Sequence, residues 1–211
     1  MNRTQIQGLG WAGGRAAAAI RQAQPDDVPA LSDFFAGLSA HARYLRFFGP
    51  VTPSAALLRT LSGCSDNVDA LVAVRGSVIV GHAMAVDRAE PQRPQRPQRP
   101  RNLQEPWGTR VADIGVVVND AWQGLGVGSA LMRALITGAQ ARGVTTLEMD
   151  VLDSNRQVLA MVTGHWPAAH VDHNPDGFAI RVGLPQVRSN PPATVPRLAI
   201  LPEPSLRWGA W

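Results

Sequence analysis

The segment from Val116 to Ser129 constrains the fold of this chain more strongly than any other part of its sequence. An apolar run is followed by a short polar step and by three glycines at alternate positions, after which a helical pattern begins. Glycine permits positive φ angles and lets a ligand approach the backbone closely. The N-terminus of a helix also presents unpaired N–H groups and a partial positive charge. The segment therefore predicts a strand, a turn and a helix that bind a phosphate group through backbone atoms.

Two common phosphate-binding motifs differ from this turn. A P-loop requires a lysine and then Ser or Thr after its last glycine, whereas all 20 Lys+Arg residues of this chain are arginine. The same composition excludes Schiff-base lysine chemistry. The dinucleotide fingerprint requires G-x-G-x-x-G directly after a strand, but Gly124, Gly126 and Gly128 are spaced G-x-G-x-G. Because Asp150 stands where a ribose-binding acid is expected, a dinucleotide site stays open as the weakest alternative.

The same turn resembles the pyrophosphate loop of the GNAT superfamily of N-acetyltransferases, which use acetyl-CoA. In that family the loop reads Gln/Arg-x-x-Gly-x-Gly/Ala after a strand, and Gln123, Gly126 and Gly128 match this wording. The resemblance covers about residues 18–184 and is closest to bacterial GNAT domains related to protein-lysine acetyltransferases. Further matching stretches are Ser39–Phe48 upstream, Ala112–Val118 as the family's fourth strand, Leu147–Leu152 as its fifth, and Ser154–Arg156 before its fourth helix.

The composition is typical of a single globular domain. A chain of 211 residues with 45% hydrophobic and 17% charged residues can bury a core. No apolar run reaches the ~20 residues of a membrane span, and Arg15 interrupts the N-terminal stretch that would otherwise resemble a signal peptide. A single cysteine cannot form an internal disulfide, so a cytoplasmic location is the default expectation.

The positive charge of the chain is local. Residues 91–101 repeat Pro-Gln-Arg three times and hold four arginines and no acid, so the formal charge of +4 falls to 4 − 4 = 0 without them. Nucleic acid is therefore not an expected partner. The repeat lacks side chains that build a core, which predicts a loop insertion at about 89–108. The predicted organisation is a disordered tail at 1–17, one domain at 18–184 and a proline-rich tail at 185–211.

The hydrophobic pattern predicts a mixed α/β sheet flanked by helices. A hairpin that turns at Gly76 indicates antiparallel pairing, and later alternation of strands and helices indicates a parallel pair. This agrees with the GNAT fold, in which the two strands at the acyl-CoA site splay apart. After Gly164 the family match is poor, so the formation of the last two strands is in question. The predicted strands are 18–22, 70–75, 77–86, 110–119, 145–152 and 178–182. One predicted helix begins at Pro25, and four others span 41–48, 54–61, 126–142 and 155–162.

The resemblance also implies where acetyl-CoA binds. Backbone N–H groups around Leu125–Ser129 would hold the pyrophosphate, and pantetheine would bond to the backbone of Val116–Val118, where one N–H would polarise the thioester carbonyl. A turn that serves packing alone is the alternative. The implied cofactor-binding residues are Val116, Val117, Val118, Gln123, Gly124, Leu125, Gly126, Val127, Gly128, Ser129 and Asn155.

Direct transfer of an acetyl group to an amine also requires a base and a proton for the leaving thiolate. Related GNATs often carry Glu in an Ala-Glu dipeptide of the fourth strand, so the resemblance implies Asp113, which follows Ala112, as the general base. A solvated carboxylate without a catalytic role is the alternative. Many relatives use a tyrosine on the fourth helix as the acid, whereas the only tyrosine here is Tyr44. Ser154 or a bound water would have to replace it.

Several other reactive or aromatic side chains are expected to be structural. A lone cysteine is more often a small buried residue than a nucleophile, and clustered loop histidines are more often without a role than metal ligands. Aromatic residues at helical spacing are more often core than acceptor lining. No metal is therefore expected. The residues concerned are Cys64; His165, His170 and His173 beside Asp172; and Tyr44, Phe47 and Phe48.

The sequence thus favours an acyl-CoA-dependent N-acetyltransferase that transfers the acetyl group of acetyl-CoA to a primary amine, either a protein lysine or a small molecule. The alternative from another class is a non-catalytic acyl-CoA-binding GNAT-like module. Such a module would have kept the glycine-rich pyrophosphate loop and lost the tyrosine that acts as the general acid in relatives. The acceptor and the oligomeric state are left open by the sequence.

Overall fold

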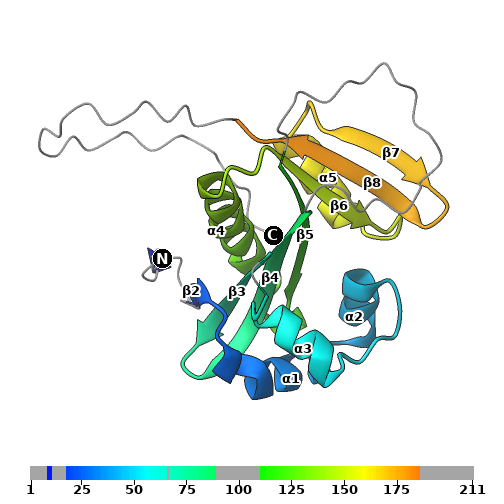
Figure 1. The fold of residues 1–211 in the computed structure, drawn as a ribbon. Coiled ribbons are helices and arrows are strands. Elements are labelled where there is room, and N and C mark those ends of the chain that lie inside the picture. Colours follow the sequence, from blue (N-terminus) through cyan, green and yellow to red (C-terminus); the bar gives the residue numbers. More distant parts are fainter. Residues whose placement is uncertain (1–8, 11–17, 66, 89–109, 186–211) are drawn as a thin grey trace, which may run out of the picture.

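The computed structural model describes residues 9–10, 18–65, 67–88 and 110–185, which form a mixed α/β fold (Figure 1). The tails predicted at 1–17 and 185–211 and the loop predicted at 89–108 lie outside the described residues, apart from a two-residue strand, β1 (Leu9–Gly10), and Pro185. Within the described ranges, no helix is long and apolar enough to cross a membrane.

The strands of the described residues form one sheet in the order β1-β2-β3-β4-β5-β6-β8-β7. Every neighbouring pair is antiparallel except β5 with β6. The predicted hairpin is β3 with β4, and it turns at Gly76 with a φ angle of 59°. After β1, the strands are β2 (Ala19–Gln22), β3 (Val68–Arg75), β4 (Val78–Arg88), β5 (Val111–Val118), β6 (Thr146–Val151), β7 (His170–Asn174) and β8 (Gly177–Gly183).

Polar caps fix where several helices begin. Ser39, Ser54 and Asn155 each accept a hydrogen bond from the backbone N–H three residues later, at 3.0, 3.3 and 3.3 Å, and thereby start α2, α3 and α5. The α-helices are α1 (Val28–Ala36), α2 (Ala40–Phe47), α3 (Ala55–Leu61), α4 (Val127–Ala141) and α5 (Arg156–His165), and the 3-10 helices are η1 (Pro25–Asp27) and η2 (Asp120–Trp122).

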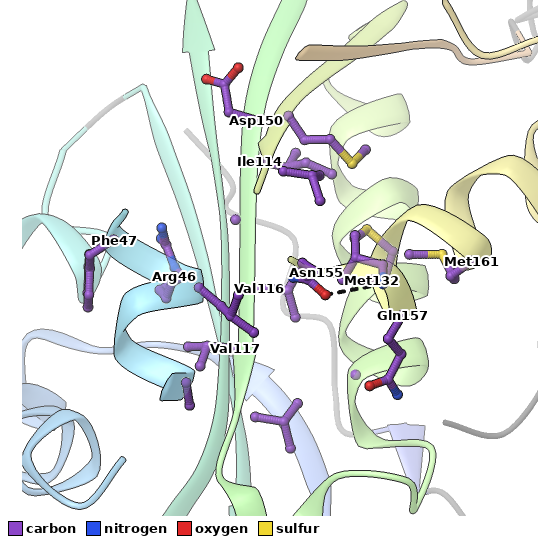
Figure 2. A pocket seen from close by; sticks show the side chains of 18 of the residues that line it. Arg46, Phe47, Ile114, Val116, Val117, Met132, Asp150, Asn155, Gln157 and Met161 are labelled. Atoms are coloured by element: carbon purple, nitrogen blue, oxygen red, sulfur yellow. Dashed lines mark hydrogen bonds between the residues drawn. The ribbon is translucent and has the colours of Figure 1, made fainter. Parts of the chain in front are cut away.

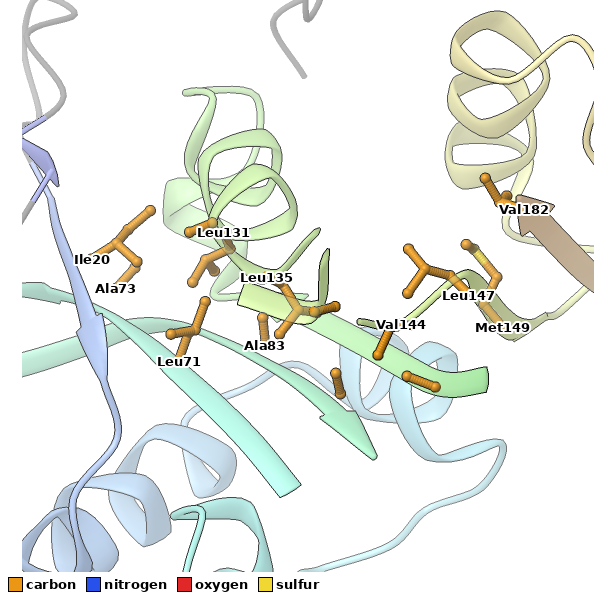
Figure 3. Close-up of a cluster of buried hydrophobic side chains, with 14 of the residues drawn as sticks. Ile20, Leu71, Ala73, Ala83, Leu131, Leu135, Val144, Leu147, Met149 and Val182 are labelled. Atoms are coloured by element: carbon orange, nitrogen blue, oxygen red, sulfur yellow. The ribbon is translucent and has the colours of Figure 1, made fainter. Parts of the chain in front are cut away.

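The two faces of the sheet bury separate hydrophobic clusters. On one face α4 and α5 pack over the strands, with Leu131 and Leu135 fully buried (Figure 3). On the other face α1, α2 and α3 pack around Phe35. Side chains of β5 alternate between these clusters, because Val117 belongs to the second whereas Val116 contacts the first. The strand that would carry the site therefore reaches both faces of the sheet.

The predicted elements up to α5 are present, and the C-terminal part differs from expectation. Both β7 and β8 form: β8 pairs with β6, and β7 pairs with β8 at the edge of the sheet. The prediction that His170 and His173 lie in a loop is wrong, because both belong to β7. The sequence hides this edge strand because Val171 is its only apolar residue, so no hydrophobic alternation marks it.

Candidate active site

A pocket of about 540 Å³ lies where β5 and β6 separate. Within residues 110–185, the two parallel strands pair over only three residues each, Val111–Asp113 with Thr146–Glu148, although β5 continues to Val118. Beyond Asp113, part of the β5 backbone bonds to β4 and the rest faces the gap. The pocket crosses the sheet: α2 lines it from one face, and α4 and α5 line it from the other (Figure 2). The predicted splaying of these strands is confirmed.

The glycine-rich turn lies at the α4 end of this pocket. Gly124 and Gly126 have φ angles of 72° and 81°, which residues with a side chain rarely adopt. Gly126 is the N-cap of α4. The first hydrogen bond of the helix runs from the N–H of Ala130 to the carbonyl oxygen of Gly126, at 3.0 Å. The N–H groups of residues 127–129 therefore have no partner within the helix and can receive an anion.

Eight of the eleven predicted cofactor-binding residues line the pocket. Of the other three, Leu125 has an exposed side chain, while the side chains of Val127 and Ser129 are buried, so Val127 and Ser129 can offer a ligand only their backbone. Gln123 ties the turn to β5, because its Nε2 donates to the Val118 carbonyl at 3.1 Å. The lining members are Val116, Val117, Val118, Gln123, Gly124, Gly126, Gly128 and Asn155.

Asp113 lies at the point where β5 and β6 separate, beside Glu148 in the last parallel pair. Arg88 of β4 contacts both carboxylates: Nε and one terminal nitrogen donate to the two Asp113 oxygens, and the other terminal nitrogen donates to Glu148, all at 2.6 Å. Arg181 of β8 donates from Nε to the second Glu148 oxygen at 2.8 Å. Two arginines therefore balance two carboxylates at this point of the sheet.

The environment of Asp113 changes its acidity. Burial raises the pKa of Asp113 above its ordinary value, Arg88 lowers it, and the negative charges of Glu148 and Asp150 raise it further. A raised pKa brings a carboxyl group closer to the range that suits a general base. The side chain is 42% exposed, so a substrate or a water molecule can reach it.

Sequence reasoning missed the partners of Asp113. The two acids of β6, Glu148 and Asp150, stand at alternate positions and therefore share one sheet face. This alternation was the only sequence signal that could have indicated acidic neighbours for Asp113. Arg88 ends a strand that precedes the Pro-Gln-Arg repeat, and Arg181 belongs to the C-terminal strand, so their convergence on Glu148 depends on the sheet order rather than on any local motif.

A second cation in the pocket was also missed. The guanidinium of Arg46 on α2 lies face-on over Gly115 of β5, since a methyl group added to Gly115 would come 2.7 Å from Cζ and 2.8 and 2.9 Å from the two terminal nitrogens. Its Nε is buried without a hydrogen-bond partner among the described residues. Burial lowers the pKa of Arg46 to about 10, so the side chain is still charged at neutral pH.

His82 is not an acid–base group at neutral pH. This residue lies on β4 opposite Val117 and is fully buried. Its Nε2 lies 2.8 Å from the Leu61 carbonyl, and because a carbonyl only accepts, Nε2 carries the proton. Burial and the positive charge of Arg46 lower the pKa of His82 to about 3. The ring is therefore neutral and structural.

The aromatic residues and the cysteine only partly follow expectation. Phe47 packs against the second cluster as predicted, with its ring centroid 5.5 Å from that of Phe35, but it also lines the pocket. Tyr44 and Phe48 are exposed, so their predicted core position is wrong; α2 ends at Phe47, and Phe48, with a φ angle of 60°, also lines the pocket. Cys64 is exposed rather than buried, because it follows the end of α3 in a turn.

The C-terminal histidines contact different partners. His165 packs its ring against Trp166. On β7, the Nε2 atoms of His170 and His173 lie 3.4 Å from Asp172 and from Asp153, respectively. In the part of the chain that the structure describes, no three metal-ligating side chains converge.

The helix that follows β6 carries no acid group into the pocket. Helix α5 presents Gln157, Val158 and Met161, and its sequence contains no tyrosine. Neither Tyr44 nor Ser154 is among the described residues that line the pocket. Helix α5 therefore contributes no tyrosine to the pocket.

A sequence model of the acetyltransferase (GNAT) family matches residues 39–163, which is more than half of the chain. The chain belongs to the GNAT acetyltransferase family. No curated protein matches the sequence at a significant level.

Solved structures share the fold of this GNAT protein at low sequence identity. The GNAT domain of S. lividans PAT gives a TM-score of 0.66 at 21% identity, covering 80% of this chain and 92% of that chain. PaiA N-acetyltransferase from Thermoplasma acidophilum, in complex with coenzyme A, gives 0.59 at 11% identity over 80% and 100%. YncA, a putative acetyltransferase from Salmonella typhimurium with acetyl-CoA, gives 0.58 at 14% identity over 87% and 100%.

Proposed function

We propose that this GNAT protein is an N-acetyltransferase that moves the acetyl group of acetyl-CoA to a primary amine. The observation that carries the proposal is the pocket that crosses the sheet between β5 and β6. It joins the glycine turn at α4 to the carboxylates and arginines on the α2 face. A cosubstrate and an acceptor can therefore meet at one point from opposite faces of the sheet.

Acetyl-CoA suits the α4 side of the pocket. The N–H groups of Leu125–Ser129 would hold its pyrophosphate at the N-terminus of α4. The unpaired backbone edge of Val116–Val118 would bond to pantetheine, and one of its N–H groups would stabilise the oxyanion that forms on the thioester. The chemistry of this cosubstrate is supported by PaiA and YncA, which share the fold and contain coenzyme A and acetyl-CoA.

Asp113 is the group that we assign to remove a proton from the acceptor. An ammonium group must lose a proton before its nitrogen lone pair can attack the thioester carbon. As the C–N bond forms, the C–S bond breaks and its electron pair leaves on sulfur, which takes the second proton of the nitrogen directly or through water. A thiol has an ordinary pKa of about 8.5, so the thiolate leaves without a strong acid. The missing α5 tyrosine is therefore compatible with turnover.

The acceptor amine belongs to a protein lysine or to a small molecule. The likeness of Ser39–Phe48 to protein-acetylating GNATs supports the first, whereas the charges that line the pocket support the second. A solved ribosomal-protein-alanine N-acetyltransferase from Brucella melitensis also shares the fold, with a TM-score of 0.55 at 19% identity over 78% of this chain and 98% of that chain.

A non-catalytic acyl-CoA-binding module is the second candidate. Arg88 occupies both oxygens of Asp113, which opposes its use as a base, and α5 supplies no acid. In such a module acetyl-CoA would bind as described, and no thiol would be released when amines are added.

Thermal unfolding followed by a thiol-release assay separates these candidates. Acetyl-CoA at ~100 times its dissociation constant should stabilise the fold by about 2.7 kcal/mol, and NADH should not. Asp113→Asn should keep this shift and lose thiol release, whereas Asp33→Asn, at an exposed carboxylate on α1, should change neither. A shift without thiol release from any amine supports the binding module. The absence of a shift with acetyl-CoA refutes both candidates.

A further inference from the structure

Two arginines line the pocket, and among the described residues only one of them has a counter-charge. Arg88 pairs with Asp113 and Glu148. Arg46 forms no hydrogen bond or ion pair with the described residues, and its Nε is buried. Burying a cation without a partner is costly, and proteins usually pair such a charge. The unpaired guanidinium therefore indicates that an anionic group of a ligand completes this part of the pocket.

The contact between the Arg46 guanidinium and Gly115 determines where the N–H groups of Arg46 point. Because its plane lies against Gly115, where a methyl group would meet Cζ at 2.7 Å, its N–H groups point along the sheet face rather than into it. The Phe47 ring, whose centroid lies 5.2 Å from Cζ, supports it from α2. A planar guanidinium held in this way matches a carboxylate, which can accept two parallel hydrogen bonds.

Acidic groups lie beside this cation on the same sheet face. Asp113 and Gly115 are alternate residues of β5, so their Cα atoms are separated by about 6.8 Å along the strand. On β6, Asp150 follows Glu148 on that face and lines the pocket as an exposed carboxylate. Since Arg88 and Arg181 already balance Asp113 and Glu148, the charged groups left over among the described pocket residues are one cation, Arg46, and one anion, Asp150. This pair of charges complements a zwitterion.

We propose that the acetyl acceptor is a free amino acid, whose carboxylate binds Arg46 and whose amino group lies toward Asp113 and Asp150. The proposal rests on the acetyltransferase function and narrows its acceptor class. In the reaction the amino nitrogen bonds to the acetyl carbon, the C–S bond breaks, and the carboxylate is unchanged. The products are an N-acetyl amino acid and CoA. A lysine within a protein chain carries no carboxylate at this distance from its amine and would leave Arg46 unpaired.

The first test compares amino acids with their own carboxamides as acceptors. A carboxamide has the less basic amine, which by itself favours the carboxamide, so a preference for the acid requires a positive charge in the site. The wild-type kcat/KM should favour the acids on the order of 10- to 100-fold, the strength of a charged hydrogen-bonded contact. Arg46→Gln should abolish this preference, so that the acid and its carboxamide are acetylated with similar kcat/KM. Arg43→Gln, on the same helix but outside the pocket lining, should behave as wild type.

Gly115→Ala supplies a second variant that keeps the charge. The added methyl group must displace the guanidinium, which is the movable end of a flexible side chain, so the fold should persist while the acid preference falls. Acetyl-CoA-induced stabilisation, measured for each variant, verifies folding. Wild-type protein that acetylates acids and carboxamides equally well, or Arg46→Gln that keeps the preference, overturns the amino-acid proposal and leaves the acetyltransferase function standing.

A binding measurement keeps the proposal testable if no acceptor is turned over. Calorimetric titration of N-acetyl amino acids into the protein saturated with CoA should show binding that Arg46→Gln weakens about 10-fold or more. Such binding without turnover refutes catalysis and supports the anion site. Binding that is equal for the N-acetyl amino acid and its carboxamide, together with no acid preference in turnover, overturns the anion site.

Discussion

Alanine substitutions at Gly126 and Gly128 should differ in their effect on stability. Gly126 has a φ angle of 81°, and an L-residue in the left-handed region costs about 1–2 kcal/mol. Gly128 lies inside α4, where a methyl group would be 3.5 Å from Val118 Cγ2, an ordinary contact. Alanine favours a helix over glycine by up to about 1 kcal/mol. Gly126→Ala should therefore destabilise the protein without ligand, and Gly128→Ala should stabilise it or leave it unchanged.

The same pair tests the pyrophosphate site. The two variants should differ by about 1–3 kcal/mol, so at roughly 2–4 °C per kcal/mol for a protein of this size their melting temperatures should differ by about 2–12 °C. Calorimetric titration with acetyl-CoA should show near wild-type affinity for Gly128→Ala, because the GNAT loop accepts alanine at this position. Gly126→Ala should bind much more weakly, since its backbone N–H groups are turned out of place. Equal losses of affinity in both variants would refute a pyrophosphate held by this turn.

Three further predictions concern acidity and backbone space. The activity of the wild type should decline as pH falls through the raised pKa of Asp113, and a kcat/KM profile with an acid limb at the ordinary Asp value would contradict this assignment. Gly177→Ala should cost at least about 2 kcal/mol in urea unfolding, because its methyl group would lie 2.3 Å from the Val151 carbonyl oxygen at a φ of 141°; Gly183→Ala, with open space, is the matched control. The pKa of His82 lies at about 3 against about 6.5 when unfolded, so the native state should lose up to about 2 kcal/mol between pH 8 and pH 5 as only the unfolded chain gains a proton. A stability–pH profile that His82→Gln leaves equally steep would contradict it.

Local patterns predicted most of the fold of this protein. Apolar periodicity and the glycine at position 76 predicted their elements from the local sequence, and the structure has these elements near the expected bounds. The edge strand β7 escaped prediction because an exposed edge needs no apolar residues. Its stability comes from hydrogen bonds to β8, which the sequence pattern does not reveal.

The residues of the site likewise fall into those that local sequence predicted and those that only the tertiary structure brings together. The glycine turn could be recognised because its function uses contiguous backbone, and Asp113 could be placed by its position on a family strand. Arg46, Arg88 and Glu148 come from α2, β4 and β6, and although Arg46 lies in a stretch that matches the family, no local pattern indicates that these three side chains meet. Only the sheet order brings them together, and only the tertiary structure shows which of the two pocket arginines is paired. The acceptor side therefore lay beyond the reach of sequence patterns.

The register of β5 and β6 explains why the pocket opens where it does. The last parallel pair sets Asp113 beside Glu148, and like charges at a paired position oppose continued pairing. Continued pairing would also bring Asp150 beside Gly115, whose face Arg46 occupies. Arg88 stabilises the two acids at the end of the pairing, while the next residues diverge. These charges therefore lie where the strand pairing ends, and they line the side of the pocket at which we propose that the acceptor binds.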